Sequence, residues 1–217
     1  IGKNHLLNDV FFTDERTGWI VGEFESIYQT TDGGKQWELV HGGEQKEMDF
    51  SDVEEGELVG ADFGVEEEVY TLNSIYFYKK NYAWCVGEYG TVLISSDGGR
   101  TWNKIRDAAD MTLCDVEFFD ESFGFAVGLD GTILKSTDGG NTWEKEKPSI
   151  VAHYYGVSFK RFGSEIERKD AVAVGQGIIA QYSFHKKPYL QNWVPALEMN
   201  YKIDYHWMYD VEFISRT

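Results

Sequence analysis

Proline, cysteine and basic residues are scarce in this 217-residue chain, and no long apolar run occurs in it. The chain has 3 Pro and 2 Cys, and its 20 Lys and Arg stand against 37 Asp and Glu, so the formal net charge is -17. Because a membrane-spanning helix needs about 20 consecutive apolar residues, no direct membrane insertion is expected. A protein of this charge repels a phosphate backbone, so nucleic-acid binding is not expected either.

The two cysteines, Cys85 and Cys114, lack the spacing of metal ligands. The histidines are not arranged with Cys or acidic residues at ligand spacing, so neither a metal nor a cofactor is expected. Both cysteines lie in expected strands, and two buried thiols are the simplest interpretation. A disulfide would indicate an oxidising compartment, and the sequence leaves the pairing open.

The chain begins at Ile1, without a Met and without the pattern of a signal peptide. We therefore expect a processed or partial product. Any targeting segment would lie outside this sequence, which by itself leaves the localisation open.

Aromatic residues and glycine are plentiful, and the acidic residues are unevenly spread. Aromatics make up 16% of the chain and Gly occurs 23 times, a mixture that suits short strands joined by tight turns. No long stretch has helical periodicity with caps. Residues 44–68 contain eleven acidic residues and one Lys, so the acidity is mainly a property of this insert.

The chain is self-similar with a period near 41 residues. Residues 71–102 align without a gap on residues 112–143, and residues 7–37 align on residues 72–102. A fourth copy is decayed, and a fifth only begins before the chain ends. The expected units span residues 6–43, 69–107, 111–148 and 152–196, with the start of a further unit at 208–217.

Each unit contains four short runs of β-branched and aromatic residues separated by turn residues. Four strands at this period are typical of one blade of a β-propeller. The expected fold class is therefore all-β, a single propeller domain over residues 1–217 built from four-stranded antiparallel blades with Asp-box turns. The propeller is expected to be partial, with four blades and the start of a fifth, and the stop inside a repeat predicts a longer parent of roughly six to eight blades.

Three units carry the Asp-box motif Ser/Thr-x-Asp-x-Gly-x-Thr-Trp, with Gln36 in place of Thr in the first. A short carboxylate can accept hydrogen bonds from nearby backbone N–H groups and fix the turn between strands three and four. Glycine tolerates positive φ there, and the Trp is expected to fill the gap between neighbouring sheets. Calcium binding is the alternative, but each turn offers one carboxylate where calcium takes about six to eight oxygens. The structural Asp-box residues are Thr30, Asp32, Gly34, Trp37, Ser95, Asp97, Gly99, Trp102, Ser136, Asp138, Gly140 and Trp143.

The repeat resembles the Asp-box, or BNR-like, propellers, which include sialidases, glucan-cleaving glycosidases and sortilin-type receptors. The runs at 18–22 and 32–37, Gly-Trp-Ile-Val-Gly and Asp-Gly-Gly-Lys-Gln-Trp, are most similar to the photosystem II stability/assembly factor family. That resemblance implies a lumenal or periplasmic propeller that holds a newly made reaction-centre subunit during assembly. It favours a non-catalytic scaffold in an extracytoplasmic location, with a protein partner or a multi-subunit complex. Photosynthetic members carry an Arg-rich binding patch, and no such patch is recognisable among the six Arg of this chain.

The topology of a blade separates its loops onto two faces. Because successive strands alternate in direction, the one-two and three-four loops lie on one face, here called the Asp-box face, and the two-three and four-one loops lie on the other, here called the two-three face. We expect partner binding on the two-three face. The candidate residues are Phe24, Glu25, Tyr89, Asp130 and Gln176 in the turns, and Phe50, Glu54 and Glu55 in the acidic insert.

Two irregular four-one connections belong to the two-three face. The acidic insert is either a charged surface loop with local packing or a recognition arm for a basic partner or a multivalent cation, since loops of this length are often functional. The aromatic-rich stretch 182–209 either covers an imperfect blade or offers rings for a protein hot spot or for sugar stacking.

No catalytic residues are assigned. The Arg-Ile-Pro motif of sialidases is missing, no nucleophile-elbow motif is present, and no carboxylate pair stands out among the acidic residues. The principal hypothesis is therefore a non-catalytic interaction or assembly scaffold. The alternative hypothesis is a propeller that binds or hydrolyses carbohydrate, for which a glycan would be the partner.

Overall fold

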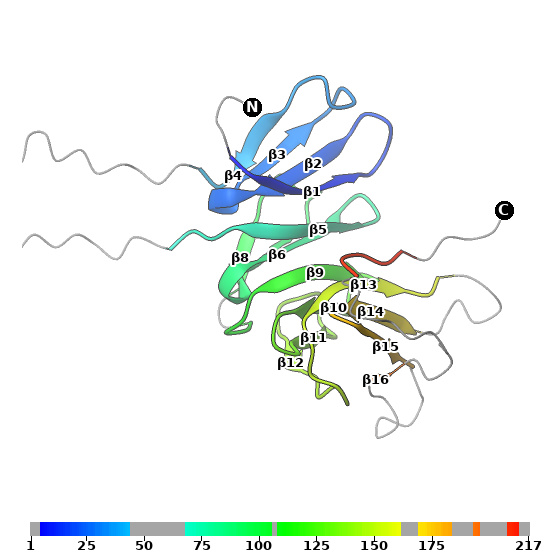
Figure 1. Ribbon diagram of the computed structural model, residues 1–217. Helices are drawn as coiled ribbons and strands as arrows, with labels where there is room; N and C mark the ends of the chain where they lie inside the picture. Colours follow the sequence, from blue (N-terminus) through cyan, green and yellow to red (C-terminus); the bar gives the residue numbers. More distant parts are fainter. Residues whose placement is uncertain are drawn as a thin grey trace, which may run out of the picture.

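The structure is a computed structural model, and it describes residues 5–43, 68–105, 108–161, 169–183, 193–195 and 208–212 (Figure 1). Phe50, Glu54 and Glu55 of the acidic insert lie outside the described residues. No helix in the described part of the chain is long and apolar enough to cross a membrane.

In the described residues sixteen strands form four sheets, here called blades 1 to 4. Blade 1 contains β1 (Leu7–Phe12), β2 (Gly18–Gly22), β3 (Ile27–Thr30) and β4 (Glu38–His41). Blade 2 contains β5 (Leu72–Tyr78), β6 (Tyr82–Gly87), β7 (Val92–Ser95) and β8 (Asn103–Ile105). Blade 3 contains β9 (Leu113–Phe118), β10 (Gly124–Gly128), β11 (Ile133–Ser136) and β12 (Glu144–Lys145). Blade 4 contains β13 (Tyr154–Phe159), β14 (Ala171–Gly175), β15 (Ile178–Tyr182) and β16 (Trp193–Pro195).

Every sheet has its strands in sequence order and pairs them antiparallel. The first strands β1, β5, β9 and β13 contact one another in turn, so each blade places its first strand beside that of the next, as Figure 1 shows. The predicted all-β propeller of four-stranded blades is thereby confirmed, and we call these first strands the inner strands.

A β-bulge begins each inner strand at the same position of the repeat. In β1 the pairing passes from Leu7 with Gly22 to Asp9 with Val21, so Asn8 is the extra residue. The same shift occurs in β5, β9 and β13. A bulge redirects a side chain, and here the Asn8 amide donates to the carbonyl of Leu72 in the next blade at 2.9 Å.

Aromatic stacking fills the gaps between blades. Trp84 of β6 lies flat on Phe118 of blade 3, with ring centroids 3.6 Å apart and planes 5° apart. Trp19 of β2 packs on Phe77 of blade 2 with the rings tilted by 31° and their centroids 4.1 Å apart. The Asp-box Trp143 meets Phe118 edge-on from within its own blade. The ring that bridges two blades is thus the Trp of the second strand, and the Asp-box Trp packs edge-on against the Phe on which that Trp lies.

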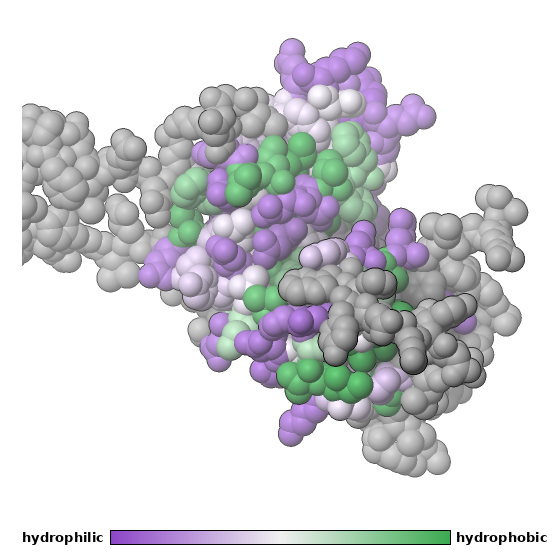
Figure 2. Space-filling model, in the orientation of Figure 1, coloured by the Kyte–Doolittle hydropathy of each residue, from purple (hydrophilic) through white to green (hydrophobic). Residues whose placement is uncertain are grey.

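The outer face of blade 1 has no described blade against it. Val10 and Phe12 are 53% and 44% exposed, whereas the equivalent Ile75 and Phe77 of blade 2 are 2% and 3% exposed. Figure 2 shows a hydrophobic band over β1. Blade 1 therefore presents an apolar sheet face of the kind that the other blades bury.

Candidate functional site

The Asp-box turns share one hydrogen-bond pattern. In blade 2 the Ser95 hydroxyl donates to Asp97 Oδ1 at 2.8 Å and accepts the N–H of Gly99 at 2.9 Å. Asp97 Oδ1 also accepts the N–H groups of Arg100 and Thr101, both at 3.0 Å. These bonds, led by the N–H of Thr101, lower the pKa of Asp97 to about 2.

The Asp boxes of blades 1 and 3 repeat these contacts. Thr30 and Ser136 donate to Asp32 and Asp138 at 2.9 Å in both cases. Each Asp box therefore uses its carboxylate inside its own turn. In the described residues no three His, Cys, Asp or Glu side chains come together as a metal site.

The turns of the two-three face adopt left-handed backbone. Asp130 and Gly131 have φ of 52° and 72°, as a type I′ Asp-Gly hairpin requires. Tyr89 and Gly90 do the same in blade 2. In blade 1 the corresponding pair is Phe24 and Glu25, which puts a side chain at the position that is Gly in the other turns.

Glu25 ties blade 1 to blade 2. Its side chain is buried, and its Oε1 pairs with Lys104 Nζ at 2.5 Å. Its N–H donates to the carbonyl of Tyr70 at 2.8 Å, and the Tyr70 ring packs on Tyr89 with centroids 4.8 Å apart. The two-three turns of blades 1 and 2 thus meet around Tyr70, and Glu25 is a structural residue of this face rather than a free surface carboxylate.

The turns of blades 3 and 4 meet around His153. Its Nδ1 accepts the N–H of Asp130 at 3.0 Å, and its carbonyl accepts the N–H of Gln176 at 3.0 Å. Tyr155 extends this group to Tyr209, with ring centroids 5.2 Å apart. Within the described residues the structure therefore assembles the candidate residues in two groups, one for blades 1 and 2 and one for blades 3 and 4.

Exposed apolar side chains gather in the loops of the two-three face. Tyr89 is 68% exposed and Val151 is 76% exposed. When the exposed apolar residues of strands β1, β4 and β16 are set aside, the exposed apolar residue on the described Asp-box face is Tyr82, at 37%. The exposed apolar residues of the two-three face are Leu6, Tyr89, Met111, Ile150, Val151 and Tyr209. Such a one-sided distribution is typical of a surface that binds protein.

The inner strands line a central cavity of about 470 Å3, where two carboxylates join neighbouring blades. Asp9 Oδ2 accepts the N–H of Ile75 at 2.8 Å, and Asp115 Oδ2 accepts the N–H of Val157 at 2.7 Å. We call these contacts carboxylate clamps. Sequence reasoning missed them, although the same Asp begins the aligned runs at 9–12, 115–118 and 210–213.

Arg161 holds three blades together beside this cavity. Its guanidinium pairs with Glu117 at 3.1 Å, donates to the Tyr76 hydroxyl at 2.8 Å and donates to the carbonyl of Phe119 at 2.9 Å. Burial raises the pKa of Glu117 to about 7, and the charge of Arg161 opposes that rise. The polar groups of this cluster are therefore committed to contacts between blades.

The sequence matches the model of a known family along most of its length. The family described as photosynthesis system II assembly factor YCF48 matches residues 1–106 and 107–193. The chain is also similar to the photosystem II assembly lipoprotein Ycf48 of Synechococcus sp. (strain CC9902). The identity is 30% over 97 residues, which are 45% of this chain and 23% of that protein.

Two solved structures share the fold. The structure of YCF48 bound to D1 peptide has a TM-score of 0.60 and 20% identity, covering 90% of this chain and 54% of that chain. The structure of YCF48 from Cyanidioschyzon merolae has a TM-score of 0.58 and 22% identity, covering 90% of this chain and 57% of that chain. This chain thus spans little more than half of these solved relatives and less than a quarter of the cyanobacterial lipoprotein.

Proposed function

Because the chain belongs to the photosynthesis system II assembly factor YCF48 family, we propose that it acts as a non-catalytic scaffold that holds a protein partner during assembly of a larger complex. The observation that carries the proposal is the concentration of exposed apolar side chains on the two-three face. A relative of the same fold has been solved with a bound peptide, which supports a polypeptide as the ligand class. The lipoprotein nature of another relative supports an extracytoplasmic location.

The proposed binding surface combines aromatic anchors with rigid turns. Tyr89 stands on a turn that is fixed by the Thr91 N–H donating to the carbonyl of Glu88 at 3.0 Å. Val151 lies against Gly131 of the neighbouring turn. Large exposed side chains on fixed backbone lose little entropy on binding, which is the usual character of interface hot spots.

The test is affinity co-purification of the tagged protein from its native source, with mass spectrometry of what remains bound. A Tyr89→Ala, Val151→Asp double variant is expected to lose the partner that the wild type retains. Tyr82→Ala is the matched control, because Tyr82 is an exposed aromatic residue on the Asp-box face. Recovery of the same partner with the double variant would contradict binding on the two-three face.

The acidic insert 44–68 is proposed as an arm that recognises basic groups on the partner. Eleven acidic residues attract a basic surface over a distance near the Debye length, about 8 Å at physiological salt. Replacing the insert with a neutral linker of equal length should weaken partner binding at low salt and remove most of its salt dependence. Equal affinity and equal salt dependence after replacement would show that the insert does not take part.

A further inference from the structure

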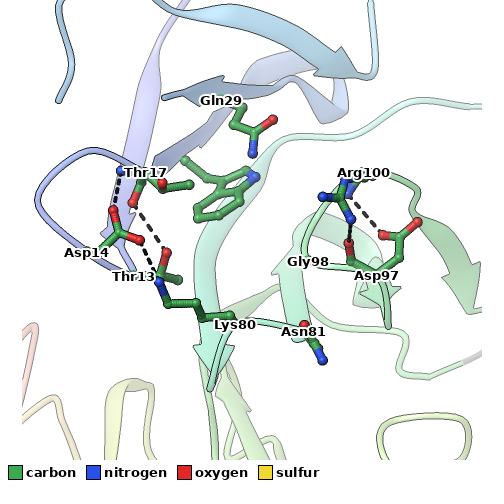
Figure 3. A pocket seen from close by; sticks show the side chains of 10 residues that line it. Thr13, Asp14, Thr17, Gln29, Lys80, Asn81, Asp97, Gly98 and Arg100 are labelled. Atoms are coloured by element: carbon green, nitrogen blue, oxygen red, sulfur yellow. Dashed lines mark hydrogen bonds and ion pairs between the residues drawn. The ribbon is translucent and has the colours of Figure 1, made fainter. Parts of the chain in front are cut away.

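A polar cavity of about 230 Å3 lies between blades 1 and 2 on the Asp-box face (Figure 3). It lies away from the two-three face and has no part in the proposed scaffold role. The one-two loops of both blades, β2, β3 and the Asp box of blade 2 all contribute to its wall. The residues on which the inference depends are Asp14, Trp19, Gln29, Lys80, Asp97 and Arg100.

Both carboxylates of the cavity are already occupied. Asp14 accepts two backbone N–H groups of its own loop and the ammonium of Lys80 at 2.8 Å, and Figure 3 shows this pair on the side of the cavity opposite Asp97 and Arg100. Asp97 accepts the bonds of its Asp box, including the hydroxyl of Thr101 at 2.7 Å. Hydrogen bonds hold the pKa of both carboxyls below the usual range, led by Lys80 for Asp14 and by Thr101 for Asp97. The two carboxylates of the wall are therefore ionised and already accept hydrogen bonds from the protein.

The cavity wall has more N–H donors than acceptors to pair with them. The indole N–H of Trp19 is buried without an acceptor among the described residues, although leaving such a group unpaired is unfavourable. Arg100 donates from one side-chain nitrogen to the carbonyl of Asp97 at 3.1 Å, which leaves further N–H groups available. The Gln29 amide adds donors without a hydrogen bond inside the described part of the chain.

The equivalent cavity between blades 2 and 3 provides an internal comparison. It has about 310 Å3, and there the indole N–H of Trp84 donates to the carbonyl of Gly139 at 2.8 Å. Among the residues that the structure describes, neither Lys nor Arg lines it. By repeat position, Lys80 is replaced by Glu121, Arg100 by Asn141 and Gln29 by Ile94. The unpaired indole and the two cations are therefore particular to the first cavity and are not required by the repeat.

We propose that this cavity binds a carboxylate group, held by Arg100 and Lys80 with the Trp19 indole as a further donor. Arg100 and Trp19 line the same cavity, and a planar guanidinium matches the two-oxygen shape of a carboxylate. The two cations of the wall balance the charges of Asp14 and Asp97, which favours a monoanion over a dianion such as phosphate. The volume accommodates one carboxylate-bearing group, either free or at the end of an acidic side chain.

The test follows the indole N–H signals of the 15N-labelled protein by NMR, with Trp19 assigned from a Trp19→Phe variant. Sodium acetate at constant ionic strength probes a free carboxylate. An acetylated, amidated tripeptide with a central Glu probes a side-chain carboxylate, with its Gln counterpart as the neutral reference. We expect saturable movement of the Trp19 signal with acetate, with the Glu peptide or with both, and none of the Trp84 signal. The pattern of responses identifies the source that the cavity accepts.

Two substitutions and one control test whether the cations of the cavity hold the carboxylate. Arg100→Asn copies the residue that blade 3 uses at this position, and Lys80→Gln removes the second cation, so each should weaken binding about tenfold without loss of fold. Lys79→Gln removes the same charge from the adjacent, exposed residue outside the cavity and should change nothing. The proposal is overturned if Trp19 does not respond up to about 0.1 M probe, where even a ~10 mM site saturates. It is also overturned by equal binding of phosphate or by unchanged binding in both variants.

Discussion

Asp115 joins three blades through one carboxylate. It extends from blade 3, accepts the Ser74 hydroxyl of blade 2 at 2.8 Å and accepts the N–H of Val157 in blade 4 at 2.7 Å. Burial raises the pKa of this carboxyl to about 6 against these bonds. The clamp therefore has an electrostatic cost in its ionised form, and that cost depends on pH.

The pH dependence has a definite sign. Because the pKa of Asp115 is higher in the folded state than the ordinary value of 3.8, the folded state binds more protons between these values. The stabilising contribution is full below pH 4 and is lost as the pH rises through 6. Relative to Asp115→Asn, the wild type should lose on the order of 2 kcal/mol of unfolding free energy between pH 4 and pH 6.5, measured by urea denaturation.

Asp97→Asn is the matched control for this measurement. The pKa of Asp97 is lowered to about 2, so its contribution is present above pH 4 and is lost only at lower pH. That variant should keep the wild-type slope between pH 4 and pH 6.5. A slope that persists in Asp115→Asn would assign the pH dependence to other groups.

At the scale of elements, the junction between blades depends on a glycine. A Cβ at Gly140 would lie 2.8 Å from Trp84 Nε1, and its φ is +88°. At Gly34 the φ is +87°, yet the nearest atom to a Cβ, in the Trp37 ring, is 3.6 Å away. The same Asp-box position is therefore crowded where a preceding blade packs against it and open in blade 1.

This difference predicts unequal effects of two identical substitutions. Both Gly34→Ala and Gly140→Ala carry the backbone cost of left-handed φ, about 1–2 kcal/mol. Gly140→Ala should lower the unfolding free energy by about 1–3 kcal/mol more, because it displaces Trp84 from its place on Phe118. Urea denaturation of the two variants measures the difference, and equal values would show that the Trp84 contact adapts freely.

The sequence could predict what lies within one repeat. The strands, the Asp boxes and the Asp130-Gly131 turn follow from short motifs, and the structure has them at these positions. Contacts between repeats could not be read in the same way. Glu25 was expected to be a surface residue, yet Lys104, 79 positions away in the chain, pairs with it and buries it. The clamp from Asp9 to Ile75 spans 66 positions and needs the stacked blades to exist.

The candidate binding residues show the same limit. Tyr89 and Asp130 could be assigned to one face from strand direction alone, because a propeller blade alternates its loops. Their grouping around Tyr70 and His153 depends on the packing of neighbouring blades and leaves no local signal. The unpaired indole N–H of Trp19 could not be predicted from the sequence either. Trp84 occupies the same repeat position, and its indole N–H donates a hydrogen bond.

At the scale of the whole molecule, the outer face of blade 1 should cause self-association of the 217-residue chain. Val10 and Leu39 are 53% and 45% exposed on this face. Contiguous exposed apolar surface favours contact with another molecule, while the net charge of -17 opposes it. Association should therefore strengthen with salt, measured by sedimentation velocity over a concentration series.

Substitution can locate that contact. Val10→Lys combined with Leu39→Lys should lower the association constant about tenfold, which corresponds to about 1.4 kcal/mol. Val151→Lys is the control, because this residue is 76% exposed on the two-three face. A wild-type chain that stays monomeric at every concentration and salt level would contradict the prediction.

The carboxylate clamps run in one direction along the chain. The partner N–H of Asp115 comes 42 positions later, and that of Asp9 comes 66 positions later. During synthesis from the N-terminus, the carboxylate oxygen of each clamp lacks its partner N–H until the following blade has emerged from the ribosome. Such a blade completes its clamp only after the next blade has been synthesised. The junctions between blades therefore form in the order in which the blades are encoded.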